Sequence, residues 1–167
     1  MEEINRTSFC KICSCVVYDN LANHESNHMI EILPHLYLGA IWNAHNMNEL
    51  TYFNINKIIN VGYEIYNKFH DAFQYKKFFW DDIEEFDISI DLDSVAQIIH
   101  EAVNSKKNVL VHCYMGRSRS PSAIIAYLIK HKGLTVDEAL KLIQSKKSDV
   151  QPNKGFIQQL RSYNYPT

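Results

Sequence analysis

The sequence lacks any run of apolar residues long enough to cross a lipid bilayer, and it has little excess of charge of either sign. Its 167 residues have a formal net charge of −2, and the isoelectric point is about 6.4. Since a membrane-spanning helix needs about 20 consecutive apolar residues, no transmembrane segment is expected. The near balance of charge also gives no general electrostatic attraction to nucleic acid or to an anionic membrane, so neither is expected as a partner.

No targeting signal is expected at the start of this sequence. The segment Met1–Arg6 has no apolar core of the kind that a secretory signal needs, and position 2 is glutamate where N-myristoylation requires glycine. No internal repeat and no low-complexity linker interrupts the chain. The length fits one folded domain with a hydrophobic core of ordinary size.

The most informative segment joins an apolar strand to an apolar helix. Val109–Val111 form a short continuous apolar run, which is typical of a strand buried on both faces. From Ser118 to Ile129 the apolar residues follow helical spacing. The turn between these segments is therefore expected at the carboxyl end of a central strand, where open α/β sheets bind their ligands.

This turn carries a cysteine and an arginine six positions apart, Cys113 and Arg119. A tight loop that opens into a helix directs its backbone N–H groups at one centre, and the positive end of the helix dipole adds to that field. The loop therefore favours an anion, and it favours Cys113 as a nucleophilic thiolate. Arg119 presents a planar fork that can hold two oxygens of a phosphoryl group. Gly116 suits the sharp bend, and the Ser120 hydroxyl could stabilise the thiolate.

The other loop residues are expected to shape the phosphate site, with His112 bracing the loop and not acting as an acid or a base. Taken alone, the cysteine would ordinarily be a small buried apolar residue and the serine a helix cap. The motif His-Cys-x-x-Gly-x-x-Arg-Ser between a strand and a helix instead indicates a phosphate-binding nucleophile loop. The residues expected to contact substrate are His112, Tyr114, Met115, Gly116, Arg117 and Ser118.

This loop resembles the His-Cys-x5-Arg-Ser/Thr signature of the dual-specificity protein phosphatases, a branch of the cysteine-based protein tyrosine phosphatases. The similarity extends to Ala126–Ile129 and Val150–Phe156 and, upstream, to Ile32–Gly39 and Ile58–Val61. The resemblance implies a three-layer α/β fold of the phosphatase type. It also implies hydrolysis of phosphotyrosine, phosphoserine and phosphothreonine through a phosphocysteine intermediate, without a metal or other cofactor.

The same resemblance predicts a general acid about thirty residues before the cysteine. Asp82 begins the segment Asp-Ile-Glu-Glu-Phe-Asp-Ile-Ser, which is similar to the family pattern Asp-x-x-x-x-Asn-Leu-Ser with Asp87 and Ile88 in place of Asn and Leu. We therefore assign Asp82 as the acid. Its neighbour Asp81 stays an alternative, because a shift of one residue in the loop would exchange the two.

The substrate is indicated less sharply than the chemistry. The chain lacks the phosphotyrosine loop typical of tyrosine-specific relatives, so a shallow site for phosphoproteins is expected, and a protein kinase is one candidate substrate. Arg117 adds a second positive charge to the loop, and the loop sequence Cys-x-x-Gly-Arg-Ser-Arg-Ser is also similar to that of a mitochondrial phosphatidylglycerophosphate phosphatase. A phospholipid or phosphoinositide is therefore the alternative substrate. A phosphate-binding pseudophosphatase is a third interpretation, but such relatives usually lose the cysteine.

Elsewhere the pattern predicts strands that alternate with helices. The expected strands are 32–38, 57–61 and 75–80, and the expected helices include 44–52 and 90–104. Gly133 is the expected end of the helix after the loop, a capping box at Thr135–Glu138 starts the next helix, and Pro152–Asn153 starts the last. This order implies a central, mostly parallel β-sheet with helices on both faces.

Residues 1–29 are expected to form an extension and residues 30–167 the catalytic domain. The extension contains Cys10-x2-Cys13 and His24-x3-His28, pair spacings that can bind tetrahedral zinc. The ordinary alternative is a polar extension with free thiols; two others are a thiol partner for oxidised Cys113 and membrane tethering by acylated cysteines. Because a catalytic thiolate requires reducing surroundings, we expect a cytoplasmic protein, with the nucleus as a second location.

Overall fold

A five-stranded sheet forms the centre of the computed structural model, which describes residues 7–18 and 20–163. In order across the sheet, the strands are β3 (Ile30–Leu33), β4 (Leu36–Gly39), β7 (Asn108–His112), β5 (Ile55–Asn60) and β6 (Gln74–Lys77). β3 runs antiparallel to β4, and the other neighbouring pairs are parallel. The prediction of a mostly parallel sheet is confirmed, and the predicted nucleophile loop follows its central strand.

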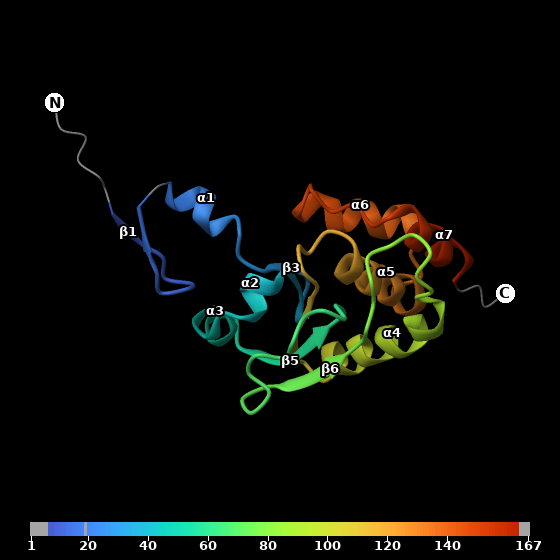
Figure 1. The fold of residues 1–167 in the computed structure, drawn as a ribbon, viewed down its shortest axis with the longest axis horizontal. Coiled ribbons are helices and arrows are strands. Elements are labelled where there is room, and N and C mark those ends of the chain that lie inside the picture. Colours follow the sequence, from blue (N-terminus) through green and yellow to red (C-terminus); the bar gives the residue numbers. More distant parts are fainter. Residues whose placement is uncertain (1–6, 19, 164–167) are drawn as a thin grey trace.

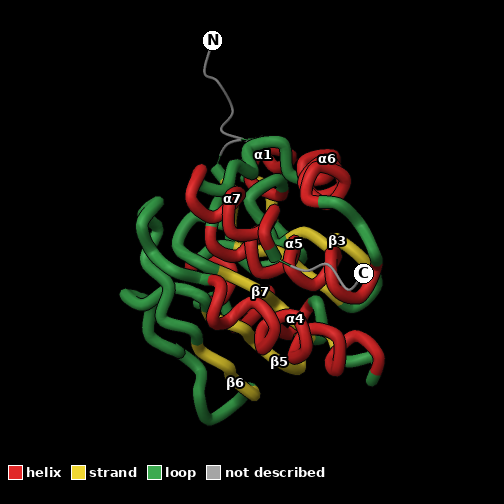
Figure 2. Tube along the Cα trace, turned by 90° about the vertical axis from the view of Figure 1, so that its right-hand side faces the viewer, coloured by secondary structure: helices red, strands yellow, loops and turns green. Residues whose placement is uncertain are grey.

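Helices cover both faces of this sheet, as predicted, but unequally. The larger core lies between one face and α4 (Ser89–Asn104), α5 (Arg119–Lys132), α6 (Val136–Lys146) and α7 (Lys154–Ser162). The smaller core lies under α2 (Ile41–Ala44) and α3 (Met47–Tyr52). Figure 1 shows the four longer helices gathered on one side, and Figure 2 shows α4, α5 and α7 lying over the strands. Side chains alternate between the faces, so Ile59 enters the larger core and Ile58 the smaller one.

Two expected elements are each divided in the structure. The prediction of one strand over 32–38 is wrong, because the chain turns at Pro34 and His35 and forms an antiparallel hairpin of β3 and β4. His35 has a φ of 71°, a left-handed conformation that interrupts the extended run. The expected helix 44–52 is also divided, since Asn46 caps the start of α3 by accepting a hydrogen bond from the N–H of Glu49.

The sequence signals for the end of α5 and for the starts of α6 and α7 are confirmed. The predicted capping box of Thr135 and Glu138 is present at the start of α6. Gly133 ends α5 with a left-handed φ of 69°. Asn153 caps α7 by accepting from the N–H of Phe156. Of these helix ends, the start of α7 lies next to the loop that begins at Asp82, because the Asn153 amide donates to the Asp82 carboxylate.

Ahead of the sheet lies a small segment of hairpin and helix. β1 (Ser8–Phe9) pairs antiparallel with β2 (Val16–Val17), and α1 (Leu21–Glu25) follows. Figure 1 shows this segment beside α2 and α3, and the side-chain amide of Asn48 on α3 donates to the carbonyl of Cys13. Its apolar core contains few residues: Cys10, Cys13 and Val17, with Ile12 and Leu21 packed against them.

Three parts of the expected domains lie outside the described residues: residues 1–6, where no secretory signal is expected, residue 19 of the extension, and residues 164–167 of the catalytic domain. Within 7–18 and 20–163, no helix has the length and apolar character needed to cross a membrane.

Candidate active site

The predicted nucleophile loop connects β7 to α5. β7 ends at His112 and α5 begins at Arg119, so Cys113 lies at the carboxyl end of the central strand. The Sγ atom of Cys113 accepts from the backbone N–H of Gly116 at 3.3 Å and lies 3.1 Å from Oγ of Ser120. Cys113 is buried. These two partners and the amino end of α5 therefore provide the polar surroundings that an anionic sulfur requires.

Gly116 has the conformation that allows the loop to close against the sheet. Its φ is 69°, and a Cβ at this position would lie 2.9 Å from the carbonyl oxygen of Gly39 at the end of β4. The chain after β4 also holds the loop directly, because the N–H of Ile41 donates to the carbonyl of Tyr114 at 3.0 Å. A side chain at position 116 would therefore push the loop away from the sheet.

Arg119 is held by a residue that the sequence analysis did not identify. Both carboxylate oxygens of Glu64 accept from its guanidinium, each at 2.7 Å, and the Trp80 carbonyl accepts from Nη1 at 3.2 Å. Burial alone would raise the pKa of Glu64, but the hydrogen bonds from Arg119 lower that pKa below its usual value. The sequence could have indicated Glu64, because it is an acidic residue that follows shortly after β5, and β5 lies next to β7 in the sheet.

One donor of Arg119 is free to bind a ligand. Among the residues that the structure describes, the buried Nε atom has no hydrogen-bond partner. Arg119 lines the same cavity as Cys113. Because a buried donor without a partner costs free energy, a phosphoryl oxygen in this cavity would be bound favourably. The placement of Arg119 fits its predicted role of holding the phosphoryl group.

Asp82 lines this cavity together with Cys113 and Arg119, whereas Asp81 does not. The Oδ1 atom of Asp82 accepts from the Ser118 hydroxyl at 2.6 Å and from the side-chain amide of Asn153 at 2.9 Å. The structure therefore favours Asp82 over its neighbour as the residue that meets the substrate. Asn153, which the sequence predicts as the start of a helix, also belongs to the site.

The loop that carries the acid packs closely against α7. Gly155 lies in the first turn of α7, and a Cβ there would lie 1.9 Å from the carbonyl oxygen of Glu84, two residues after the acid. Gln159 holds the same loop further along, because it accepts from the N–H of Ile88 and donates to the carbonyl of Phe86, each at 2.8 Å. The position of the acid thus depends on the absence of a side chain at Gly155.

His112 lies behind the loop and does not line the cavity. Its side chain is buried, and desolvation lowers its pKa to about 3, so the imidazole is neutral near pH 7. The Nδ1 atom lies 3.3 Å from the carbonyl oxygen of Cys113. This placement agrees with a bracing role. The expectation that His112 contacts substrate is corrected, because its ring is enclosed by protein.

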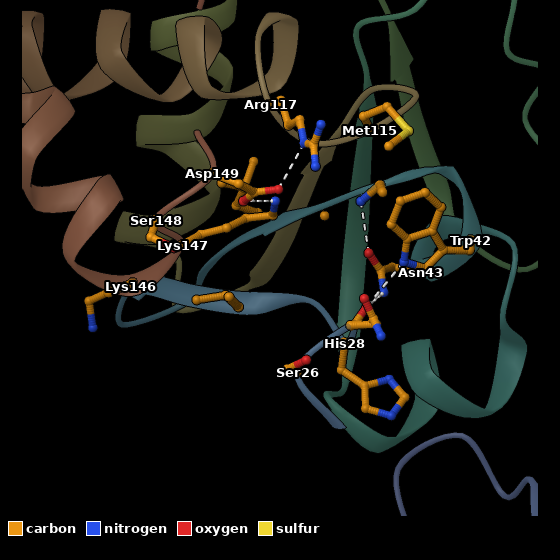
Figure 3. Close-up of a pocket in the computed structure, with 15 residues that line it drawn as sticks. Ser26, His28, Trp42, Asn43, Met115, Arg117, Lys146, Lys147, Ser148 and Asp149 are labelled. Carbon is orange, nitrogen blue, oxygen red and sulfur yellow. Dashed lines mark hydrogen bonds and ion pairs between the residues drawn. The ribbon is translucent and has the colours of Figure 1, made fainter. Parts of the chain in front are cut away.

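The cavity around Cys113 has a volume of about 360 Å³, and the exposed side chains of Tyr114 and Met115 lie on its rim. Arg117 also lines it, but the Nε atom of Arg117 donates to Asp149 at 2.8 Å on the surface. A second cavity of about 430 Å³ is lined by Met115 and Arg117 and, further away, by residues 26–28; Trp42 lies beside Met115 (Figure 3).

A cysteine sulfur that accepts from a loop amide at a helix N-terminus, a clamped arginine beside it and an aspartate on a neighbouring loop define a cysteine-dependent phosphatase. Comparison with protein families names the branch within this class. Residues 36–165 match the catalytic domain of the dual specificity phosphatases. The chain belongs to the dual specificity phosphatase family.

Curated relatives agree with this assignment. The chain is 35% identical over 133 residues to dual specificity protein phosphatase 1B of Arabidopsis thaliana, covering 80% of each chain. It is 40% identical over 133 residues to the protein phosphatase Slingshot homolog of Xenopus laevis, covering 80% of this chain and 19% of the relative. The chain thus spans a fifth or less of the length of the Slingshot relatives. The crystal structure of DUSP15 matches with a TM-score of 0.79 and 29% identity, covering 84% of this chain and 89% of that chain.

The four zinc candidates of the amino-terminal segment also come together. One ligand atom from each of Cys10, Cys13, His24 and His28 lies within 4.8 Å of the others. This cluster shares no residue with the cavity around Cys113.

Proposed function

We propose that the protein hydrolyses phosphate monoesters on tyrosine and on serine or threonine of proteins, through a phosphocysteine intermediate. The observation that carries the proposal is the placement of Cys113, Arg119 and Asp82 around one cavity. Membership of the family, and the naming of the relatives as protein phosphatases, support a phosphoprotein as the substrate.

In the first step, the Sγ atom of Cys113 attacks phosphorus in line with the leaving oxygen. The S–P bond forms as the P–O bond breaks, and Asp82 gives its proton to the departing oxygen. The loop N–H groups and Arg119 hold the equatorial oxygens of the phosphoryl group in the transition state. Glu64 keeps the guanidinium in the orientation that this contact needs.

In the second step, water attacks the phosphorus of the phosphocysteine. The ionised Asp82 accepts a proton from that water, the S–P bond breaks, and Cys113 leaves as a thiolate while inorganic phosphate is released. The Ser120 hydroxyl, 3.1 Å from Sγ, stabilises the departing thiolate.

The phospholipid alternative rested on Arg117 as a second positive charge in the loop and on the similarity of the loop sequence to a mitochondrial phosphatidylglycerophosphate phosphatase. The Nε atom of Arg117 donates to Asp149, so this charge is already paired at the surface. We therefore retain a phosphoprotein as the substrate and a protein kinase as one proposed example. The need for a reduced thiol supports a cytoplasmic or nuclear location, which fluorescence microscopy of the tagged chain would test.

Hydrolysis of p-nitrophenyl phosphate in the presence of EDTA tests the chemistry. We expect turnover by the wild type, none by Cys113→Ser, and a fall for Asp82→Ala that is largest with poor leaving groups. Phosphotyrosine and phosphothreonine peptides and a phosphoinositide, assayed side by side, test the substrate class. A higher kcat/KM for the phosphoinositide would favour the lipid alternative. Failure of the folded, reduced wild type to turn over any of these would favour a phosphate-binding pseudophosphatase.

A further inference from the structure

A second cluster of reactive side chains lies in the amino-terminal segment. Sγ of Cys10 is 3.3 Å from Nε2 of His28, and Sγ of Cys13 is 3.1 Å from Nε2 of His24. One ligand atom from each of these four residues lies within 4.8 Å of the others. Around a tetrahedral zinc ion with Zn–S of about 2.3 Å and Zn–N of about 2.0 Å, ligand atoms are separated by roughly 3.3–3.8 Å. The cluster therefore needs only small inward shifts to surround one ion.

The local fold presents these residues on the elements that a zinc finger uses. Cys10 and Cys13 lie between β1 and β2, and the two histidines come from α1 and the turn after it. Both cysteines are buried and neither forms a disulfide. Since few of the segment's apolar residues are buried, hydrophobic burial contributes little to its stability. Segments of this size usually need a metal or a disulfide to hold one conformation.

A carboxylate from the catalytic domain orients one of the histidines. Nδ1 of His28 is 3.0 Å from Oε2 of Glu49 on α3, and both side chains are buried. Glu49 is itself fixed, because its Oε1 atom accepts from the backbone N–H of Met29 at 2.7 Å and from the amide of Asn43 at 3.0 Å. Nε2 of His28 thus faces Cys10, and metal-binding histidines usually donate their second ring N–H to a carboxylate in this way.

We propose that Cys10, Cys13, His24 and His28 bind one structural Zn²⁺ ion and that Glu49 is its outer-sphere partner. Two thiolates and two imidazoles in a tetrahedral arrangement select zinc over magnesium or calcium, which take oxygen ligands. The alternative of acylated cysteines does not fit Cys10 and Cys13, because both are buried and face imidazole rings.

The ion joins the extension to α3 of the catalytic domain. One link is the carboxylate of Glu49, and a second is the hydrogen bond of 3.1 Å from the Asn48 amide to the Cys13 carbonyl. Residues 26–28, which include the ligand His28, also form one wall of the cavity that adjoins Met115 (Figure 3). Zinc binding therefore fixes one wall of a cavity next to the active site.

The zinc content of the purified full chain tests the site. We expect about one zinc ion per chain by inductively coupled plasma mass spectrometry in the wild type. The double variant Cys10→Ser/Cys13→Ser should lose it. Cys15→Ser is the matched control, because Cys15 belongs to the same segment but is exposed and lies outside the cluster. Zinc retained by the double variant, or lost equally from the control, overturns the proposal.

Two further measurements do not depend on the folding of cysteine variants. Replacement of zinc by Co²⁺ in the wild type should give the visible absorption of tetrahedral cobalt with thiolate ligands. Glu49→Gln keeps all four ligands and should weaken zinc binding by about 10–100-fold in chelator competition, whereas Glu25→Gln, which removes an exposed charge from α1, should not. A wild type that binds neither zinc nor cobalt contradicts the assignment, whatever its phosphatase activity.

Discussion

Replacing Glu64 by glutamine tests whether the orientation of Arg119 depends on that carboxylate. Glu64 accepts two hydrogen bonds from the guanidinium, both at 2.7 Å. In Glu64→Gln one acceptor remains, and the new amide NH₂ faces an N–H donor. Such a charged hydrogen bond contributes about 1.5–3 kcal/mol. The Glu64 side chain is 32% exposed. Solvent reduces the contribution accordingly, so we expect the free energy of unfolding to fall by about 1–2 kcal/mol.

The kcat/KM of Glu64→Gln should fall as well, because Arg119 binds the phosphoryl oxygens most strongly in the transition state. A loss of about 1.4–2 kcal/mol of transition-state stabilisation corresponds to a fall of about 10–30-fold in kcat/KM, which p-nitrophenyl phosphate kinetics would measure. Glu101→Gln, which removes an exposed carboxylate from α4, is the control. If Glu64→Gln matched this control in both kcat/KM and unfolding free energy, the reasoning would be refuted.

The stability difference between wild type and Glu64→Gln should depend on pH with a defined sign. Burial raises the pKa of folded Glu64, but Arg119 more than offsets this and lowers it. The stabilisation is therefore present above the unfolded pKa of about 4.3 and is lost as pH falls through the lower folded pKa. Urea unfolding at a series of pH values should show the two proteins converging in acid. A gap that widens toward low pH would contradict the assignment.

Three further substitutions test other parts of the site. In Gly155→Ala the new Cβ meets the Glu84 carbonyl oxygen, 1.9 Å from its position; we expect kcat to fall most with poor leaving groups, and urea unfolding to show a loss of about 1–3 kcal/mol. Ser120→Ala removes the hydroxyl 3.1 Å from the sulfur of Cys113, so rapid-quench kinetics should show slower breakdown of the phosphoenzyme and turnover lower by about 10-fold. Arg117→Ala breaks an exposed ion pair, and thermal unfolding should show a change of less than about 1 kcal/mol.

The catalytic loop could be predicted from the sequence because its determinants are contiguous. A strand, a tight turn and a helix N-terminus follow one another between Val109 and Ile129, and the turn itself contains the cysteine, the glycine and the arginine. Helix signals of the same local kind, such as the capping box at Thr135, were also reliable. Each depends on hydrogen bonds between residues a few positions apart.

Residues brought together by the tertiary fold were harder to predict. Glu64 and Arg119 are 55 positions apart, and only the parallel pairing of β5 with β7 makes them neighbours. Asn153 was recognised as a helix start, but its contact with Asp82 spans 71 positions. In the segment 32–38, Pro34 was the available signal of the turn at His35, since proline usually interrupts a strand. The apolar pattern alone does not report the turn.

Trapping the phosphocysteine tests the central claim most directly. Asp82→Ala lacks the group that activates water, so the intermediate should accumulate when this variant is mixed with p-nitrophenyl phosphate and rapidly denatured. Peptide mass spectrometry should then find a phosphate adduct on Cys113, and none in the double variant that also carries Cys113→Ser. Wild-type turnover with no adduct at Cys113 in the trapped sample, or with the phosphate on another residue, would contradict the mechanism.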